Sequence, residues 1–314
     1  MKILYLVVPC YNEEEVLPET TKRLIVKFNN LIHEQRIGEL SRIVYVNDGS
    51  KDKTWTIIEE IVQSNALFQG IKLSRNKGHQ YALLAGLMYA KNKADIVISM
   101  DADLQDDIDA IDAMIDANDK GFDVVYGVRS ARKTDTFFKK TTAELFYKLM
   151  KTLGADIVYN HADYRLMSRR ALDGLSEFDE ANLFLRGIVP LIGYPSTIVE
   201  YERNERFLGE SKYPLKKMLN FAFDGITSFT VKPIRMISVI GFLVFSVSIL
   251  IMMYFFYAYF AGKTVAGWAT TVISIWALGG LQLLAIGIIG EYIAKTYIET
   301  KQRPKYIIET IIGK

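Results

Sequence analysis

The sequence predicts an α/β protein with a mostly parallel central sheet, followed by amphipathic helices and a C-terminal hairpin of two transmembrane helices. Three observations support this fold class. Short apolar runs alternate with longer helical patterns over residues 1–211. Two long stretches without charged residues follow. Acidic and polar side chains gather where the apolar runs end, as they do in enzymes built on parallel sheets.

Seven apolar runs have the length and composition of strands, and four longer stretches have the pattern of helices. The predicted strands are 4–9, 42–48, 70–73, 95–101, 123–129, 164–168 and 196–201. The predicted helices are 14–33, 52–64, 79–91 and 107–118. Asp52 is a suitable N-cap for the second helix. Because parallel sheets bind ligands at the carboxyl edge of their strands, we expect the functional residues at the ends of these runs.

The most informative strand end carries Asp101 and Asp103. Carboxylates one residue apart on an extended backbone point to the same side, so they can share a hard divalent cation and hold it against a diphosphate. A solvated acidic loop is the alternative for the pair taken alone. The chain has neither of the glycine-rich phosphate-binding motifs G-x-G-x-x-G and G-x-x-x-x-G-K-[ST]. A metal ion and side chains must therefore compensate the negative charge of any bound phosphate.

Two uncharged stretches, 236–262 and 264–290, are separated by Lys263. Each exceeds the roughly 20 apolar residues that a membrane-spanning helix needs. Buried helices of a globular domain are the alternative, but two in tandem favour spans at about 236–261 and 265–290. Basic residues flank both spans, so we expect both termini in the cytoplasm. They are Lys212, Lys216, Lys217, Lys232, Arg235, Lys295, Lys301, Arg303 and Lys305.

Composition narrows the class of partner and the compartment. Lys and Arg total 38 against 36 Asp and Glu, so the net charge of +2 gives no field for nucleic acid. Cys10 is the single cysteine, which excludes an internal disulfide and agrees with a reducing compartment. Segments 137–153 and 214–230 mix basic with aromatic and aliphatic residues. Such helices lie in the headgroup layer of a membrane or pack on the sheet.

Six motifs occur in an order that resembles family 2 glycosyltransferases of the GT-A fold. Within them the sequence is similar to polyprenyl-phosphate glycosyltransferases, which include bacterial undecaprenyl-phosphate glucosyltransferases and dolichol-phosphate-mannose synthases. The motifs are VPCYNE at 8–13, VNDGSKDKT at 46–54, SRNKGHQ at 74–80, DADLQD at 101–106, DYRLM at 163–167 and RFLGESKY at 206–213. The two-span tail resembles the bacterial branch.

The resemblance implies a donor half of the site. Asp101, Asp103 and Gln105 would ligate Mg²⁺ or Mn²⁺. The residues that would hold the donor nucleotide are Pro9, Tyr11, Asn12, Glu13, Asp48, Arg75 and Asp101. The Asp48-Gly49-Ser50 run also fits a simple turn. The chain departs from the family twice: Asn47 stands where Asp is common, and Asp107-Ile108-Asp109 replaces Pro-Pro-Glu, which leaves that loop less restricted.

The resemblance also implies an acceptor half. A lipid phosphate carries about −1.5 to −2 charges near neutrality and needs cations. Arg129 and Arg206 stand where the family places acceptor-phosphate arginines, and Lys139 and Lys140 match approximately or snorkel to the interface.

Asp163, with Asp103, is the predicted catalytic carboxylate. An ionised phosphate is already a nucleophile, so three roles are open to Asp163: orienting the acceptor, accepting a residual proton or stabilising charge on the sugar. Pairing with Arg165 is its structural alternative. We expect His79 to hydrogen-bond within the loop at 75–80, near the nucleotide.

Four segments follow from these assignments: a cytoplasmic GT-A domain at 1–211, a juxtamembrane amphipathic segment at 212–235, two spans within 236–291 and a cytoplasmic tail at 292–314. The expected localisation is the bacterial inner membrane, with membrane lipid as a partner. Four glycines would let the spans approach closely within one chain or in a homo-oligomer. They are Gly279, Gly280, Gly287 and Gly290.

The expected reaction is inverting transfer of one hexose from a nucleotide sugar to undecaprenyl phosphate, for modification of a cell-envelope glycan. UDP-glucose is favoured as donor over UDP-N-acetylhexosamine and GDP-mannose. A flippase and a further glycosyltransferase would act downstream. A processive polysaccharide synthase is disfavoured because the chain lacks Gln-x-x-Arg-Trp. A non-catalytic membrane scaffold is disfavoured because the acidic and basic site residues are intact.

Overall fold

The computed structural model describes residues 1–129, 161–180, 183–202, 232–261 and 267–313. Lys139, Lys140, Arg206 and both predicted amphipathic segments lie outside these residues. The chain divides into two compact units. The first, here called the sheet domain, comprises Met1–Tyr147, Asp156–Pro214 and Arg303–Lys314. The second, the helical unit, comprises Lys148–Ala155 and Leu215–Gln302.

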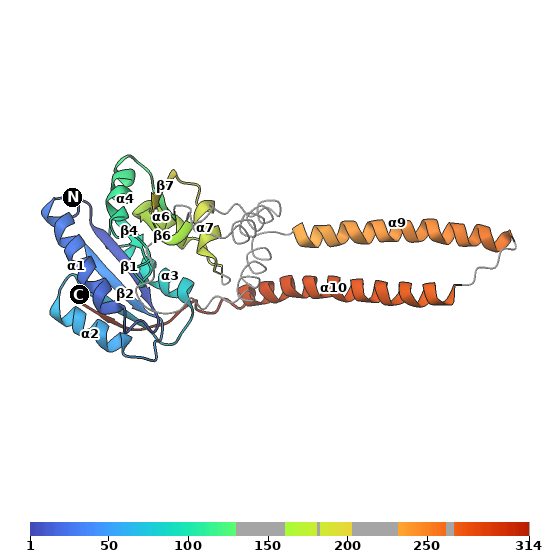
Figure 1. Cartoon of the computed structure of the whole chain (residues 1–314), viewed down its shortest axis with the longest axis horizontal. Helices are drawn as coiled ribbons and strands as arrows, with labels where there is room; N and C mark the ends of the chain where they lie inside the picture. Colours follow the sequence, from blue (N-terminus) through green and yellow to red (C-terminus); the bar gives the residue numbers. More distant parts are fainter. Residues whose placement is uncertain (130–160, 181–182, 203–231, 262–266, 314) are drawn as a thin grey trace. The chain divides into compact units, whose positions relative to one another are not determined.

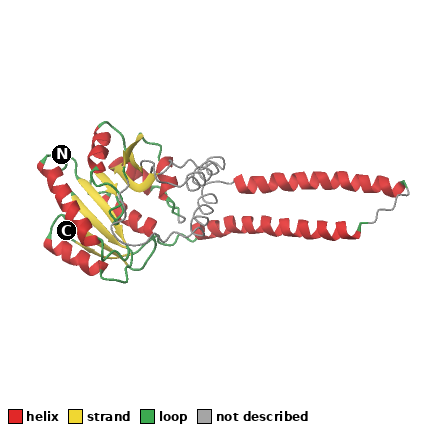
Figure 2. Ribbon diagram, viewed as in Figure 1, coloured by secondary structure: helices red, strands yellow, loops and turns green. Residues whose placement is uncertain are grey.

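The sheet domain is built on an eight-stranded sheet among the described residues (Figure 2). Its strands are β1 (Leu4–Cys10), β2 (Arg42–Asn47), β3 (Phe68–Leu73), β4 (Ile96–Ser99), β5 (Val124–Arg129), β6 (His161–Ser168), β7 (Ser196–Tyr201) and β8 (Ile308–Ile312). Their order is β7-β5-β6-β4-β1-β2-β3-β8. Strands β6 and β8 run antiparallel to their neighbours, and the other pairs are parallel. The mostly parallel sheet predicted from the sequence is therefore confirmed.

Helices cover both faces of this sheet, because its central strands bury alternate residues on opposite sides. In β1, Leu4 and Leu6 join the core that contains Leu24 and Phe28 of α1. The opposite face packs on α3, where a Cβ added to Gly86 would lie 2.8 Å from Cγ2 of Val46. Figure 1 shows α1 and α3 on opposite sides of β1. The helices are α1 (Leu17–His33), α2 (Thr54–Ser64), α3 (His79–Ala90), α4 (Ala110–Asp119), α6 (Arg169–Ser176) and α7 (Leu185–Leu191).

Strand β8 was not anticipated from the sequence, which predicts only a tail after the second span. It pairs antiparallel with β3, with Gly70 opposite Ile312 and Lys72 opposite Thr310. Just before β8, the carbonyl of Ile307 accepts a hydrogen bond from the Ser74 amide at 3.0 Å. The chain thus leaves the sheet domain, forms the helical unit and returns to complete the edge of the same sheet.

The helical unit contains α9 (Lys232–Phe260) and α10 (Trp268–Thr300). Both expose large apolar side chains, including Phe242 at 69% and Leu283 at 72% of their surface. Within the described residues, Leu278–Thr300 is long and apolar enough to cross a membrane, with a mean hydropathy of 1.3. In α9 the corresponding apolar stretch is shorter, Val239–Ile251. Helix α10 continues past the predicted end of the second span at residue 290.

Candidate active site

The ends of β1 and β2 are fastened to each other by polar contacts. Asn12, whose φ is 54°, accepts the Lys51 amide on Oδ1 at 2.9 Å, and its own amide donates to Oγ of Ser50 at 3.1 Å. The Glu13 amide donates to Oγ1 of Thr54 at 2.9 Å. Beside this junction the Tyr11 side chain is exposed, whereas Pro9 is buried within β1. The predicted nucleoside-binding residues therefore lie together, with the Tyr11 ring facing outward.

Asp48 holds the loop that follows β3. Its two carboxylate oxygens accept the amides of Lys77 and Gly78 at 2.7 and 2.8 Å. Gly49, with a φ of +64°, allows this approach, since an added Cβ would lie 2.5 Å from the Asn76 amide nitrogen. Arg75 is exposed on the same loop. Both oxygens of Asp48 thus order the loop. Any contact between Asp48 and the nucleoside would have to use oxygens that already accept these two hydrogen bonds.

The predicted metal-binding pair follows β4 and lies among other carboxylates. Asp103 is buried, and its Oδ1 accepts the Gln105 amide at 3.1 Å. Burial raises the pKa of Asp101 to about 6; His79 opposes the rise, and the charges of Asp106, Asp163 and Asp103 add to it. Oδ2 of Asp106 is buried without a hydrogen-bond partner among the described residues. This concentration of negative charge would be relieved by a cation.

The donor set at this strand end suits a hard cation. Asp101 and Asp103 offer carboxylate oxygens and Gln105 an amide oxygen, which are the ligand types that Mg²⁺ and Mn²⁺ prefer. In the part of the chain that the structure describes, no three His, Cys, Asp or Glu side chains are grouped so that they could hold a metal ion. A cation bound here would therefore take its remaining ligands from substrate and water.

Asp163 lies close to the predicted metal-binding pair because β6 runs antiparallel to β4. Ser99 pairs with Arg165, and continuing that register by two residues sets Asp163 opposite Asp101. His79 lies between the two carboxylates, with Nε2 at 3.6 Å from Oδ1 of Asp101 and 3.4 Å from Oδ2 of Asp163. The expectation that His79 hydrogen-bonds within the loop at 75–80 did not include these contacts with Asp101 and Asp163.

Asp163 is the centre of a buried ion-pair cluster. Its Oδ1 accepts Nη2 of Arg165 at 2.7 Å, and Arg186 donates to both oxygens at 3.2 Å. Nε2 of Gln80 donates to Oδ2 at 3.3 Å. Burial alone would raise the pKa of Asp163, but the His79 contact and the charges of Arg186 and Arg165 hold it well below its usual value. Asp163 is therefore an ionised, heavily hydrogen-bonded group and a weak base.

The sequence analysis gave pairing with Arg165 as the alternative to a catalytic role for Asp163, and the structure contains this ion pair. Arg186 and Gln80 were missed: Arg186 lies outside the six motifs, and Gln80 ends the motif at 74–80 but nothing in the sequence relates it to Asp163. Gln80 also accepts the Leu185 amide on Oε1 at 3.0 Å, which ties the start of α3 to the start of α7. The second arginine on Asp163 could be found only from the fold.

Arg129 is the one predicted acceptor-phosphate residue within the described part of the chain. It closes β5, and its Nη2 donates to Oδ1 of Asp106 at 3.1 Å while Nε donates to the hydroxyl of Tyr201 at 3.2 Å. The Asp106 side chain is fully buried and that of Arg129 is 23% exposed. Burial lowers the pKa of Arg129, but the contacts with Asp106 and Tyr201 outweigh it and raise that pKa above its usual value.

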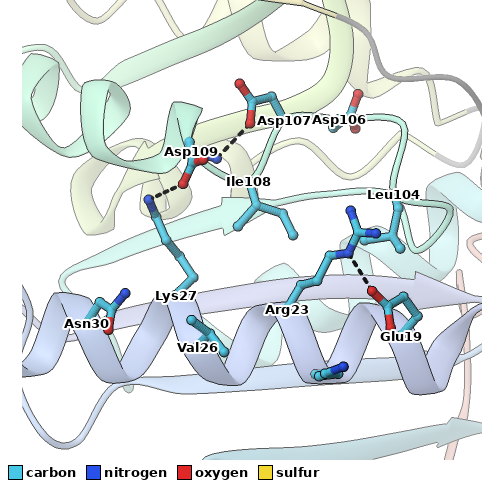
Figure 3. A pocket seen from close by; sticks show the side chains of 11 residues that line it. Glu19, Arg23, Val26, Lys27, Asn30, Leu104, Asp106, Asp107, Ile108 and Asp109 are labelled. Carbon is cyan, nitrogen blue, oxygen red and sulfur yellow. Dashed lines mark hydrogen bonds and ion pairs between the residues drawn. The ribbon is translucent and has the colours of Figure 1, made fainter.

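A cleft of about 440 Å³ lies between α1 and the loop after β4 (Figure 3). Its lining comprises Glu19, Lys22, Arg23, Val26, Lys27, Asn30, Leu104, Asp106, Asp107, Ile108 and Asp109. Figure 3 shows Arg23 paired with Glu19 and Lys27 paired with Asp109. The nitrogen–oxygen distances in these two ion pairs are 2.8 and 2.7 Å. None of the predicted donor, metal or acceptor residues lines it, but Asp106, which contacts Arg129, does, so the cleft borders the group of carboxylates around Asp101.

Comparison with known proteins gives matches over most of the chain. The Glycosyl transferase family 2 profile matches residues 5–175. The glycosyltransferase YkoT of Bacillus subtilis is 55% identical over 307 residues, which are 98% of this chain and 91% of the relative. The bactoprenol glucosyl transferase of Shigella phage SfV is 42% identical over 306 residues, 97% of each chain.

A solved structure was also similar: glucosyl-3-phosphoglycerate synthase from Mycobacterium tuberculosis, in complex with Mn²⁺, UDP and phosphoglyceric acid. It is 16% identical, with a TM-score of 0.48 over 72% of this chain and 76% of that one. The family match contains the strand-edge residues from Tyr11 to Asp163.

Proposed function

Because the chain belongs to glycosyl transferase family 2, we propose that it transfers one glucose from UDP-glucose to undecaprenyl phosphate, with inversion at the anomeric carbon. The observation that carries the proposal is the meeting of the Asp101/Asp103 pair with Asp163 across His79 at one edge of the sheet. Similarity to a bactoprenol glucosyl transferase over 97% of both chains supports glucose as the sugar and a polyprenyl phosphate as the acceptor.

The donor half would be formed by the ends of β1, β2 and β4. The exposed Tyr11 ring offers a stacking face to the base, and Asn12, Glu13 and Arg75 lie on the loops around it. Asp101, Asp103 and Gln105 would hold Mg²⁺ or Mn²⁺ beside the diphosphate. When bound, the metal supplies a Lewis acid that offsets charge on the departing nucleoside diphosphate.

The acceptor half would bring a phosphate to the opposite side of the anomeric carbon. Arg129 binds this phosphate with Arg206, Lys139 and Lys140, which lie outside the described residues. An ionised phosphate needs no strong base, which agrees with an Asp163 that stays ionised. Asp163 therefore stabilises positive charge on the sugar ring in the transition state and orients the acceptor, while departure of the diphosphate completes a single displacement.

Purified full-length protein in detergent micelles, given undecaprenyl phosphate, Mg²⁺ or Mn²⁺ and radiolabelled UDP-glucose, is expected to form an organic-extractable, mild-acid-labile lipid that carries one hexose. UDP-N-acetylglucosamine and GDP-mannose serve as competing donors. Products with several sugars would favour a processive synthase. Absence of transfer from every donor would contradict the proposal and favour a scaffold.

We also propose that α9 and α10 form a membrane hairpin, with the sheet domain on the cytoplasmic side. Strand β8 follows α10 and pairs with β3 of the same sheet that precedes α9. Both ends of the helical unit must therefore lie on one side of any membrane, so the chain between them crosses it an even number of times. In this proposal α9 and α10, which contain the apolar stretches Val239–Ile251 and Leu278–Thr300, would supply the two crossings. Membrane attachment would confine the site to the plane of its lipid substrate.

Single-cysteine labelling tests this topology, since Cys10 is the single cysteine and is buried. We expect a membrane-impermeant maleimide added to spheroplasts to label Gly267→Cys, at the start of α10. Lys301→Cys, just after α10, should react only after permeabilisation. Equal labelling of both positions from outside would contradict the hairpin, because one crossing separates them.

A further inference from the structure

Three buried or half-buried side chains meet where β5 and β7 end. Arg129 and Tyr201 are the last residues of these parallel strands and are partners in their register. Asp106 reaches them from the loop after β4. Its Oδ1 accepts hydrogen bonds from the Tyr201 hydroxyl at 2.5 Å and from Nη2 of Arg129 at 3.1 Å. Nε of Arg129 donates to the Tyr201 hydroxyl at 3.2 Å, which closes a three-membered cluster.

The cluster is costly to build and is held firmly. The Asp106 carboxylate is fully buried, and a buried charge is tolerated only when charged and hydrogen-bonding partners surround it. The Tyr201 ring meets the Tyr164 ring edge-on, with centroids 5.3 Å apart and planes at 83°. The Tyr164 hydroxyl donates to the Asp107 carbonyl at 2.9 Å. Tyr201 therefore cannot turn without disturbing a neighbour that is itself hydrogen-bonded.

These contacts fix the orientation of Arg129. Nε and Nη2 form the side-on edge of the guanidinium, and Asp106 and Tyr201 hold that edge in place. A long arginine side chain otherwise loses rotamer freedom when it binds an anion, whereas one that is already ordered loses less. The rigid guanidinium fork is the group that meets phosphate with two parallel hydrogen bonds.

We propose that Asp106 and Tyr201 are positioning residues, which hold Arg129 in the orientation that binds the phosphate of the lipid acceptor. The inference rests on the proposed function, in which Arg129 contacts that phosphate. Asp106 belongs to the same loop as Asp101 and Asp103, so this loop carries the metal-binding pair on one side and orders an acceptor residue on the other.

Tyr201→Phe tests the inference, because it keeps the ring and removes the hydroxyl. In assays with purified full-length protein, we expect KM for undecaprenyl phosphate to rise about tenfold, with KM for UDP-glucose and kcat unchanged. The matched control is Tyr45→Phe, which removes another buried hydroxyl, one that bonds Oγ1 of Thr21 at 2.9 Å. A structural role would move both Michaelis constants or the thermal midpoint rather than the acceptor constant alone, and such a result would overturn the inference.

A double-mutant cycle supplies the sharper readout. If Tyr201 acts through Arg129, Tyr201→Phe should have no further effect on the acceptor KM in an Arg129→Gln background. Independent, multiplicative effects would overturn the inference. Should Tyr201→Phe fold poorly, Arg129→Lys replaces it, since lysine keeps the charge but lacks the side-on edge; it should raise the acceptor KM similarly, and no rise would count against the inference.

The inference and the proposed function can fail separately. An unchanged acceptor KM in Arg129→Gln would overturn the positioning role while the wild-type protein still forms the glycolipid. No transfer by the wild-type protein would overturn the proposed function itself.

Discussion

Asp101→Asn is expected to lower kcat/KM for transfer at least about 100-fold while raising the thermal midpoint of the metal-free protein. The two effects have one origin. Burial raises the pKa of Asp101 to about 6; His79 opposes the rise, and repulsion from the negative charges of Asp106, Asp163 and Asp103 adds to it. Asparagine removes the repulsion, which stabilises the fold at pH 7.5. It also removes a charged metal ligand, so the diphosphate loses charge compensation as it departs.

Mn²⁺ titration should separate these effects. Because metal binding relieves the same repulsion, millimolar Mn²⁺ with UDP should raise the thermal midpoint of the wild-type protein and raise that of Asp101→Asn much less. Asp119→Asn is the matched control, since it removes the charge of an exposed residue that pairs with Lys2. A variant with wild-type activity, or one less stable than the wild type without metal, would contradict a cation site at this pair.

Asp163→Asn is expected to abolish most activity and, unlike Asp101→Asn, to destabilise the protein by about 3 kcal/mol or more. Arg165 is 1% exposed and loses its paired charge when Asp163 is neutralised. For a domain of this size, that cost lowers the thermal midpoint by roughly 6 °C or more. An unchanged thermal midpoint would contradict the view that Asp163 stabilises the fold through a buried ion pair. Asp163 would then act only in the transfer reaction.

The double variant Asp163→Asn/Arg165→Met distinguishes the structural role of Asp163 from its chemical one. Replacing a buried ion pair by an apolar side chain is often neutral, so the double variant should recover most of the lost thermal midpoint. Activity should stay low, because no carboxylate faces the sugar. Recovery of both would show that the charge of Asp163 matters only for folding.

The pH dependence of this stability follows from the lowered pKa of Asp163. A carboxyl group whose folded-state pKa lies below its unfolded value of about 3.9 contributes stability that is fully present above that value. The contribution is lost as the pH falls through the folded-state pKa. The difference in midpoint between wild type and Asp163→Asn should therefore shrink below about pH 4.

The sheet could largely be predicted because its strands are short apolar runs bounded by polar residues, a local signal. Strand β8 could not, since Ile308–Ile312 follows a charged segment and becomes a strand only by pairing with β3. The position of Asp101 and Asp103 just after β4 was predictable from the apolar run that precedes them, and their binding of a metal stays a prediction. The pairing of Asp163 with Arg165 was available as an alternative, because residues two apart in a strand face the same side.

The missed contacts all depend on tertiary structure. His79 bridges Asp101 and Asp163 because α3 begins beside the end of β4 and the start of β6. Arg186 reaches Asp163 from a helix 23 residues further along the chain. Asp106 and Tyr201 are 95 residues apart, and no local pattern relates them. Sequence reasoning therefore located the strand ends and their carboxylates, whereas the cations and hydroxyls that hold them needed the fold.

Strand β8 also sets the order in which the protein can be completed during synthesis. Lys72 in β3 and its partner Glu309 are separated by 237 residues, and both helices of the helical unit are translated between them. Until β8 emerges, the β3 edge presents unpaired backbone groups that other chains could join. A ribosome that stops before residue 308 leaves the sheet unfinished, so the nascent chain gains its last strand only after α9 and α10 exist. Chains that end before β8 would leave the β3 edge exposed. Such chains are expected to aggregate.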